Sequence, residues 1–291
     1  MKYRIRQTTI YTYGETVPYA RHLLRMIPAE RRLQKVPMAE LTIDPTPDER
    51  SIGIDFFGNK VVHVSIGRPH RRLVIESTSE VSMEPRQLTT PGDTPSVKTI
   101  REAAAASTRT DGRGAAGFLF PSRLVSIDRA IRDYAAASLP DGRPVLEGAL
   151  ELTQRIHQDF TYDPVATEVT TPVEEVFAQR RGVCQDFAQV MISGLRGLGL
   201  PAAYVSGFLR TEPAPGTPRL IGADAMHAWV AVWCGDALRW RGIDPTNSVA
   251  TALDHVEVAF GRDYADVSPL DGVVVTAGRQ TLDVAVDVVP I

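Results

Sequence analysis

The strongest constraint on the fold of this chain is a change in the spacing of its apolar residues. Up to residue 84, apolar positions alternate with polar ones or form β-branched runs, which is the pattern of strands in a sheet. The expected strands cover residues 2–13, 60–66 and 72–82. Turn signals separate them at Pro45, Pro47, Gly58-Asn59 and Pro69. Residues 1–84 are therefore predicted to form an N-terminal β-sandwich domain.

The rest of the chain has the apolar spacing of helices, followed again by strands. Helices are expected over residues 126–138 and 144–160 and in a segment that begins near Cys184. Another opens with Thr171-Pro172-Val173-Glu174, a capping box with Thr as the N-cap. Strands are expected over residues 202–209, 226–233, 238–243, 272–276 and 282–289. This order predicts an α+β domain over residues 144–291, joined to the first by a linker with helices over residues 85–143.

Charge and composition argue against several classes of partner. The 291 residues include 32 Lys plus Arg against 35 Asp plus Glu, so the formal charge is −3. That balance gives no electrostatic basis for binding a nucleic acid or an anionic membrane. Residues 1–13 lack the apolar run of a signal peptide, and two cysteines are too few for a disulfide framework. A cytoplasmic location, where a thiol stays free, is expected.

Cys184 directly follows Arg180-Arg181-Gly182-Val183 and opens a predicted helix. Unpaired backbone N–H groups and the positive end of the helix dipole meet at this position, and both favour a thiolate. The alternative is a buried and inert cysteine, because a free thiol often behaves as a small apolar group. The helix start thus permits a reactive thiol.

A predicted hairpin over residues 226–245 places a histidine next to a carboxylate. Gly235-Asp236 between two apolar strands suggests a two-residue turn, which sets Cys234 opposite Ala237. In that register His227 lies directly across from Asp244, within the reach that a carboxylate needs to hold an imidazole. A one-residue slip of the turn would send one of the two to the opposite face.

A thiol, an imidazole and a carboxylate are the parts of nucleophilic acyl transfer. In that chemistry Cys184 is the nucleophile, His227 is its base and Asp244 orients the base. The backbone N–H of Cys184 is placed to stabilise the oxyanion. The oxyanion needs a second hydrogen-bond donor, for which Tyr162 and Gln185 are the candidates. Both residues are also expected to contact the substrate.

Four motifs in this order resemble the bacterial transglutaminase-like superfamily. They are Gly182-Val183-Cys184-Gln185-Asp186-Phe187-Ala188, Tyr204-Val205-Ser206-Gly207-Phe208, His227-Ala228-Trp229-Val230 and Asp244-Pro245-Thr246-Asn247. The resemblance extends to residues 262–267 with Pro269, and residues 1–84 look like the β-sandwich that precedes the core in this family. It implies a papain-like core over residues 144–291, with Cys184, His227 and Asp244 as its catalytic triad and a peptide or protein amide as substrate.

The residues after the nucleophile differ from those of the animal cross-linking enzymes, which usually carry Trp there. Gln185 and Asp186 stand in this chain instead, as in the microbial branch. Hydrolysis of a peptide or isopeptide bond through a thioester is therefore favoured over the alternative of amine transfer to glutamine. A non-catalytic peptide-binding module on the same fold is a third possibility, against which the intact triad argues.

Other polar and aromatic residues allow further interpretations. Cys184, His227, Cys234 and His255 could be counted as zinc ligands, but they lack the close paired spacing of a structural site, so neither a metal nor another cofactor is expected. Trp229 is a candidate for the wall of a substrate cleft or for the core. Pocket loops such as residues 211–223 determine the substrate, and the sequence leaves its identity and the oligomeric state open.

Overall fold

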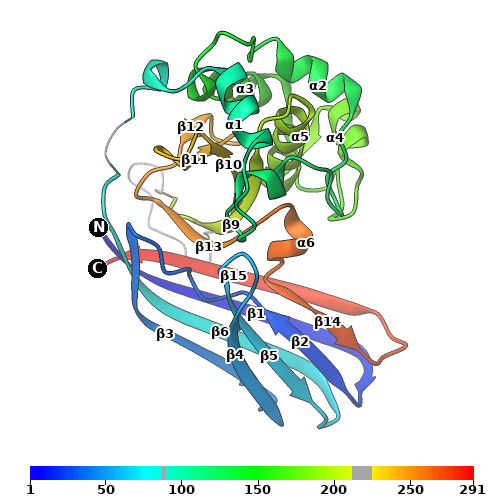
Figure 1. Ribbon diagram of the computed structural model, residues 1–291. Coiled ribbons are helices and arrows are strands. Elements are labelled where there is room, and N and C mark those ends of the chain that lie inside the picture. Colours follow the sequence, from blue (N-terminus) through cyan, green and yellow to red (C-terminus); the bar gives the residue numbers. More distant parts are fainter. Residues whose placement is uncertain (87–88, 212–224) are drawn as a thin grey trace, which may run out of the picture.

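The computed structural model of the protein describes residues 1–86, 89–211 and 225–291. A strand-only part lies below a sheet that is covered by helices, and the two chain ends meet beside the junction (Figure 1). The N–H of Ile291 donates to the carbonyl of Lys2 at 3.0 Å, which ties these ends together. In the described residues, no helix is long and apolar enough to cross a membrane.

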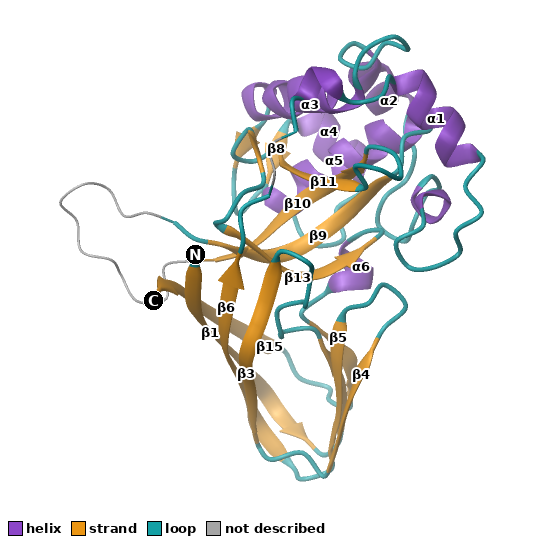
Figure 2. Cartoon of the chain, turned by 60° about the vertical axis from the view of Figure 1, so that its left-hand side comes forward, coloured by secondary structure: helices purple, strands orange, loops and turns teal. Residues whose placement is uncertain are grey.

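The strand-only part is a sandwich of two antiparallel sheets (Figure 2). One sheet contains β1 (Lys2–Val17), β3 (Gln34–Asp44), β6 (His70–Met83) and β15 (Gln280–Pro290), and the other contains β2 (Ala20–Leu24), β4 (Glu49–Ile54), β5 (Lys60–Ile66) and β14 (Leu270–Val274). Their orders are β15-β1-β6-β3 and β14-β2-β5-β4. Burial alternates along β1 because one face of the sheet is covered, and Leu24, Ile66 and Leu73 from both sheets share one buried cluster. The predicted N-terminal β-sandwich is confirmed.

The last strands of the chain correct the predicted domain boundaries. β15 pairs with β1 from Tyr3 opposite Pro290 to Tyr13 opposite Gln280, and β14 pairs with β2. The strands at the end of the predicted domain 144–291 therefore complete the N-terminal sandwich. Local spacing reveals that a segment is a strand, but not which distant strand it pairs with, and here the end of the chain covers an edge of β1.

The second part is α+β, as predicted. Its antiparallel sheet has the order β12-β11-β10-β9-β13 and comprises β9 (Ala202–Leu209), β10 (Ala225–Trp233), β11 (Trp240–Asp244), β12 (Val249–Ala250) and β13 (His255–Gly261). The helices are α1 (Val97–Ala105), α2 (Arg129–Ala136), α3 (Val145–Asp159), α4 (Val173–Gln179), α5 (Cys184–Gly197) and α6 (Tyr264–Val267). Short elements are the 3-10 turns η1 (Pro91–Asp93) and η2 (Ala115–Phe118) and a parallel pair, β7 (Thr161–Tyr162) and β8 (Arg181–Gly182). Helix α5 packs against β9 and β10, so its first residue lies beside the sheet.

Residues 85–143, predicted as a linker, belong to the helical layer of the second part. Val97 and Ile100 of α1 and Ile131 of α2 are buried in the same cluster as α5. Helix α2 packs closely on α5 at Gly194, where an added Cβ would lie 2.8 Å from the Cβ of Ala135. The amphipathic helices of this segment therefore stabilise the core instead of only connecting two domains.

Buried polar contacts hold the two parts together. Asn59 is fully buried, and its side chain donates to the carbonyl of Phe260 and accepts from the N–H of Phe260, both at 2.8 Å. Arg31 of the sandwich approaches a Glu257 carboxylate oxygen of β13 at 2.7 Å, and Arg113 of the second part approaches the same oxygen at 2.7 Å. Because Asn59 is buried and the Arg31–Glu257 pair is partly buried, these hydrogen bonds fix the sandwich against β13.

The predicted capping box is wrong. The N-cap of α4 is Pro172, with extended backbone, and no side chain caps it. The hydroxyl of Thr171 instead accepts from the N–H of Glu168 at 2.9 Å, and the Glu174 carboxylate accepts from Ser126. The Thr171 hydroxyl therefore serves a turn in the preceding loop and the Glu174 carboxylate a tertiary contact, so neither caps the helix.

Candidate active site

Cys184 is the first residue of α5, as predicted, and it is partly exposed. Asp186 holds this helix start, because its Oδ2 accepts from the N–H of Val183 at 2.8 Å and from the hydroxyl of Thr167 at 2.6 Å. Gly182 makes room for that carboxylate, since an added Cβ would lie 2.4 Å from the same oxygen. The sulfur is thereby placed where the first N–H groups of the helix lack helical partners.

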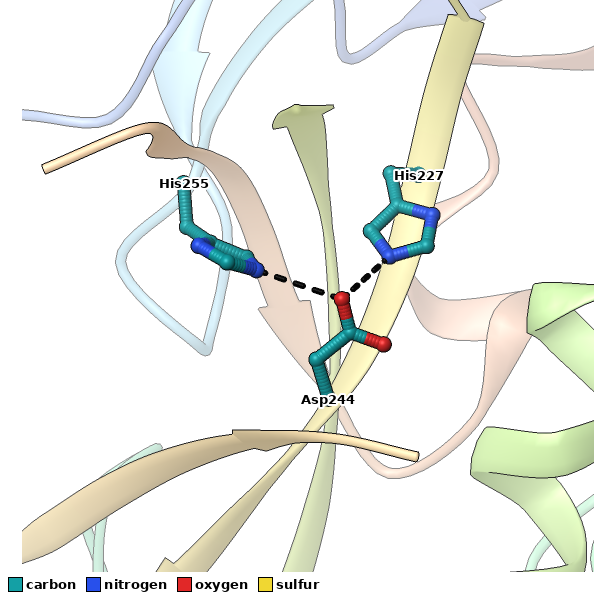
Figure 3. A group of neighbouring side chains, drawn as sticks. All are labelled: His227, Asp244 and His255. Atoms are coloured by element: carbon teal, nitrogen blue, oxygen red, sulfur yellow. Dashed lines mark hydrogen bonds and ion pairs between the residues drawn. The ribbon is translucent and has the colours of Figure 1, made fainter. Parts of the chain in front are cut away.

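His227 of β10 and Asp244 at the end of β11 form the predicted pair (Figure 3). Nε2 of His227 lies 2.8 Å from Oδ2 of Asp244, which is fully buried. The other carboxylate oxygen accepts from the backbone N–H groups of Thr246 and Asn247 at 2.9 and 3.2 Å. The side chain of Asn247 donates to Oδ2 at 2.7 Å, so the carboxylate cannot rotate away from the ring without losing several hydrogen bonds.

The hairpin register differs from the predicted one by two residues. Val230 pairs with Ile243 and Trp233 with Trp240, which extends to Trp229 opposite Asp244. The loop is longer than two residues, because the N–H of Cys234 donates to the carbonyl of Arg239 at 2.9 Å. Side chains alternate with a period of two, so an even slip leaves His227 and Asp244 diagonal to each other on the same face.

His255, considered in the sequence analysis only as a zinc ligand, is the member of this group whose contact with Asp244 was not predicted. It opens β13, it is buried, and its Nε2 lies 3.2 Å from the same Oδ2 of Asp244 (Figure 3). Its Nδ1 accepts from the N–H of Ala252 at 3.4 Å, so the proton of a neutral ring resides on Nε2 and points at Asp244. The β-branched residues at the start of β13 could have indicated a strand. The order of strands in the sheet, which brings this strand near Asp244, cannot be inferred from local sequence.

Burial and hydrogen bonding have opposite effects on the charges of His227 and Asp244. Burial disfavours a charged ring at His227, but the hydrogen bond to Asp244 and the interaction with Cys184 outweigh it and raise the pKa of His227 to about 9. Burial also opposes a charge on Asp244, whereas hydrogen bonds from His227 and His255 hold the pKa of this carboxyl well below its ordinary value. At neutral pH the ring of His227 is therefore an imidazolium that faces the sulfur of Cys184.

One cavity of about 390 Å³ contains the thiol and the imidazole. Cys184 and His227 line it together with Tyr204 and Ser206 of β9. Because Asp244 binds Nε2 of His227, Nδ1 is the nitrogen left to exchange a proton with the sulfur. The structure thus brings Cys184, His227 and Asp244 into one arrangement, with the acid behind the ring and the thiol in the cavity.

The three predicted substrate contacts have different positions. Gln185 lines the cavity, and its Nε2 donates to the carbonyl of Val169 at 3.0 Å. Tyr162 is more than half exposed, and burial together with the nearby Cys184 raises its pKa. Trp229 is buried and does not line the cavity; its ring lies edge-on to His255, with centroids 5.3 Å apart. Trp229 therefore supports the histidines from behind and is no wall of the cleft.

Two arrangements of metal ligands can be compared with the structure. Cys234, one of the four residues weighed as zinc ligands, is buried, and burial raises the pKa of its thiol to about 12. The ligand atoms of His227, Asp244 and His255 lie within 4.8 Å of one another, as in many metal sites. Each Nε2 already has Oδ2 of Asp244 as a hydrogen-bond partner, which accounts for this spacing. Metal-independent chemistry stays a prediction.

Residues 211–223, expected to determine the substrate, lie outside the described residues except for Thr211. Two family models match the chain. Residues 3–82 match the bacterial transglutaminase-like N-terminal region, and residues 132–245 match the transglutaminase-like superfamily.

Similar proteins include characterised and uncharacterised ones. An uncharacterised protein of Mycobacterium tuberculosis is 41% identical over 297 residues, which cover 99% of this chain and 93% of the relative. Protein-glutamine gamma-glutamyltransferase of Pseudomonas aeruginosa is 36% identical over 103 residues, or 34% of this chain and 15% of that protein. The crystal structure of a candidate cysteine protease from Cytophaga hutchinsonii has a TM-score of 0.78 at 20% identity, covering 100% of this chain and 91% of that one, which shows a shared fold.

Proposed function

The chain belongs to the transglutaminase-like superfamily, and on that premise we propose that it hydrolyses a peptide or isopeptide bond through a thioester on Cys184. The observation that supports this most is the His227–Asp244 contact of 2.8 Å beside a cavity that also holds the thiol. A carboxylate that binds one ring nitrogen fixes the tautomer of the other, and that other nitrogen is the one that can serve the sulfur.

In the first half of the reaction the thiol proton of Cys184 has passed to Nδ1 of His227, and the resulting thiolate attacks the amide carbonyl carbon. A C–S bond forms, the C=O π electrons move to oxygen, and the N–H of Cys184 at the start of α5 stabilises the oxyanion. The intermediate collapses as the C–N bond breaks, and the imidazolium of His227 protonates the departing amine. A thioester and a neutral imidazole remain.

The second half regenerates the thiol. The neutral imidazole of His227 takes a proton from water as the water oxygen attacks the thioester carbonyl. The C–S bond then breaks, the acid is released, and the proton returns to the Cys184–His227 pair. Asp244 keeps the ring oriented in both halves, since its second oxygen is held by backbone N–H groups.

Amine transfer is the second candidate function. A primary amine could replace water in the second half, and the relation to protein-glutamine gamma-glutamyltransferase over 103 residues supports it. The presence of Gln185 and Asp186 after the nucleophile favours hydrolysis.

The two functions differ in what resolves the thioester. Glutamine-bearing peptides should be offered with and without a primary amine, while ammonia release and amine incorporation are followed by mass spectrometry. Hydrolysis predicts the free acid in both reactions. A predominance of incorporated amine would refute the hydrolase, and full activity of Cys184→Ala would refute thiol chemistry altogether.

A further inference from the structure

The cavity beside Cys184 has a second wall that belongs to the N-terminal sandwich. Three cross-strand pairs of β1 and β15 form it, namely Gln7 with Val286, Thr9 with Val284 and Tyr11 with Leu282. Residues two apart on a strand share a face, so all six side chains point the same way. The sandwich and the part of the chain that carries Cys184 and His227 therefore enclose one cavity between them.

This wall has a closed end and an open end. Val286 is 1% exposed, whereas Val284 and Leu282 are 48% and 52% exposed. The cavity is thus sealed near Gln7 and Val286 and opens to solvent toward Leu282. Two large aliphatic side chains are thus exposed side by side on a wall of the cavity that contains the thiol, unlike an isolated apolar residue on the surface.

The chemistry of the lining favours a neutral, aliphatic occupant. Among the described residues that line the cavity there is no Asp, Glu, Lys or Arg. The protonated ring of His227 is the charged group of the lining, and it lies beside Cys184 on the other wall. A charged side chain packed against the β1–β15 wall would lose its hydration without gaining a partner of opposite charge there, which is unfavourable. An aliphatic side chain would bury its surface against the valines of β15, which is favourable.

Gln7 supplies a polar group at the closed end. It is 2% exposed, and its Oε1 has no hydrogen-bond partner among the described residues. Its Nε2 makes only a 3.5 Å contact with the hydroxyl of Thr9. Because a buried acceptor without a donor is costly, an N–H group brought in by a ligand would satisfy it.

We propose that the β1–β15 wall binds the acyl donor, and that this donor is a neutral peptide segment with an aliphatic side chain, whose backbone N–H binds Gln7. The inference rests on the proposed function, since it concerns the substrate that Cys184 attacks. It makes Val284 and Gln7 specificity-determining residues supplied by the N-terminal domain. The hydrogen bonds of Asn59 to Phe260 keep that domain fixed against the sheet that carries the histidine.

The test uses alkylation of Cys184, because that reaction needs no known substrate. We compare the alkylation rates of Cys184 with two probes, bromoacetyl-leucine amide and bromoacetyl-glutamate amide. The leucine-to-glutamate rate ratio at Cys184 is then divided by the same ratio for a free cysteine peptide, which removes the difference in intrinsic reactivity of the probes. The leucine probe is expected to react at least ~10-fold faster in this normalised ratio, as apolar pockets discriminate elsewhere. Val284→Asp should reduce the preference at least ~10-fold.

Ala285→Asp is the matched control. Ala285 follows Val284 in β15, is exposed on the opposite face of the strand and does not line the cavity. The substitution Ala285→Asp therefore adds the same charge as Val284→Asp, but outside the wall. Its preference should equal that of the unaltered protein. A normalised ratio near one in the unaltered protein, or equal effects of the two substitutions, would overturn the proposal.

Gln7 is tested with a probe pair that differs in one N–H. The unaltered protein should prefer bromoacetyl-leucine amide to its N-methylated form by about 2- to 10-fold, and Gln7→Met should abolish that preference. Equal rates with both probes before substitution would exclude Gln7 as an acceptor. If iodoacetamide reacts with Cys184 no faster than with a free cysteine peptide, the thiol chemistry itself fails, and the proposed substrate with it.

Discussion

Replacing Asp244 by Asn keeps the shape of the side chain but removes its charge, and the structure indicates how the site would respond. Oδ1 of Asp244 accepts from two backbone N–H groups, which cannot be rearranged. The new Nδ2 must therefore take the place of Oδ2, where it faces His227, His255 and Asn247. An imidazole can adapt by changing tautomer, so Nδ2 would donate to Nε2 of His227. The ring proton then moves to Nδ1, which can no longer accept a proton from the thiol.

The size of the effect follows from the charge and from the tautomer. The pKa of His227 is raised from 6.5 to about 9, which corresponds to roughly 3 kcal/mol, although burial alone would lower this pKa. Loss of the carboxylate charge would remove much of this stabilisation of the imidazolium, which corresponds to roughly 10²- to 10³-fold in the protonation equilibrium of the ring. With the wrong tautomer added, turnover is expected to fall by about 10³- to 10⁴-fold, as in a serine protease triad.

The assay combines turnover of a peptide amide with alkylation of Cys184 by iodoacetamide at pH 7. Both rates should fall in Asp244→Asn, while thermal unfolding stays cooperative. Asp254→Asn is the matched control, because that carboxylate accepts from the hydroxyl of Tyr3 at 2.6 Å and lies outside the triad. It should leave both rates near normal. Turnover of Asp244→Asn within about threefold of normal, well under the 10³-fold expected, would refute the role of the carboxylate.

Other perturbations probe the charge, the packing and the metal. Since His227 is protonated below a pKa of about 9, kcat/KM for an amide should fall above that pH; a fall near 6.5 would contradict the raised value. For the same reason the ring stabilises the fold fully below pH 6.5, and thermal unfolding should show this contribution being lost as pH rises through 9. Gly207→Ala would place a Cβ 2.4 Å from the ring of Trp229, so the melting temperature of this variant should drop by the equivalent of about 1–3 kcal/mol. Gly142→Ala is the control and should not destabilise the fold, because a Cβ at residue 142 would have no other atom within 4 Å. Equal melting temperatures of the two variants would disprove the close contact at Gly207. His255→Gln should reduce turnover while Cys184 still reacts with iodoacetamide, and unchanged turnover would limit His255 to packing. Dialysis against EDTA should leave turnover unchanged, and its loss would point to a metal at the histidines.

The sequence could predict the His227–Asp244 pair because of the period of a strand. The turn signal of Gly235-Asp236 was misleading, and the register shifted by two residues. An even shift preserves the face of every side chain, so the pair survived the error. Cys184 was predictable for a similar reason, since helix starts depend on local residues.

The contributions of β13 and β15 could not be predicted from local patterns. His255 reaches Asp244 only because β13 lies beside β9 at one end of the sheet order. The second wall of the cavity depends on β15 pairing with β1, its partner from the opposite end of the chain. Alternation identifies strands but carries no information about which distant edges meet, and sheet order follows from the packing of the whole chain.

The most direct measurement is the mass of the protein during turnover. A peptide amide is mixed with the protein, the reaction is quenched in acid within the first turnovers, and the intact mass and the site of modification are determined. An acyl group bound to Cys184, removable by hydroxylamine and absent in Cys184→Ala, is the predicted result. Turnover that proceeds without any acyl group on Cys184, or with the group on Cys234, would contradict a thiol, imidazole and carboxylate acting together at this site.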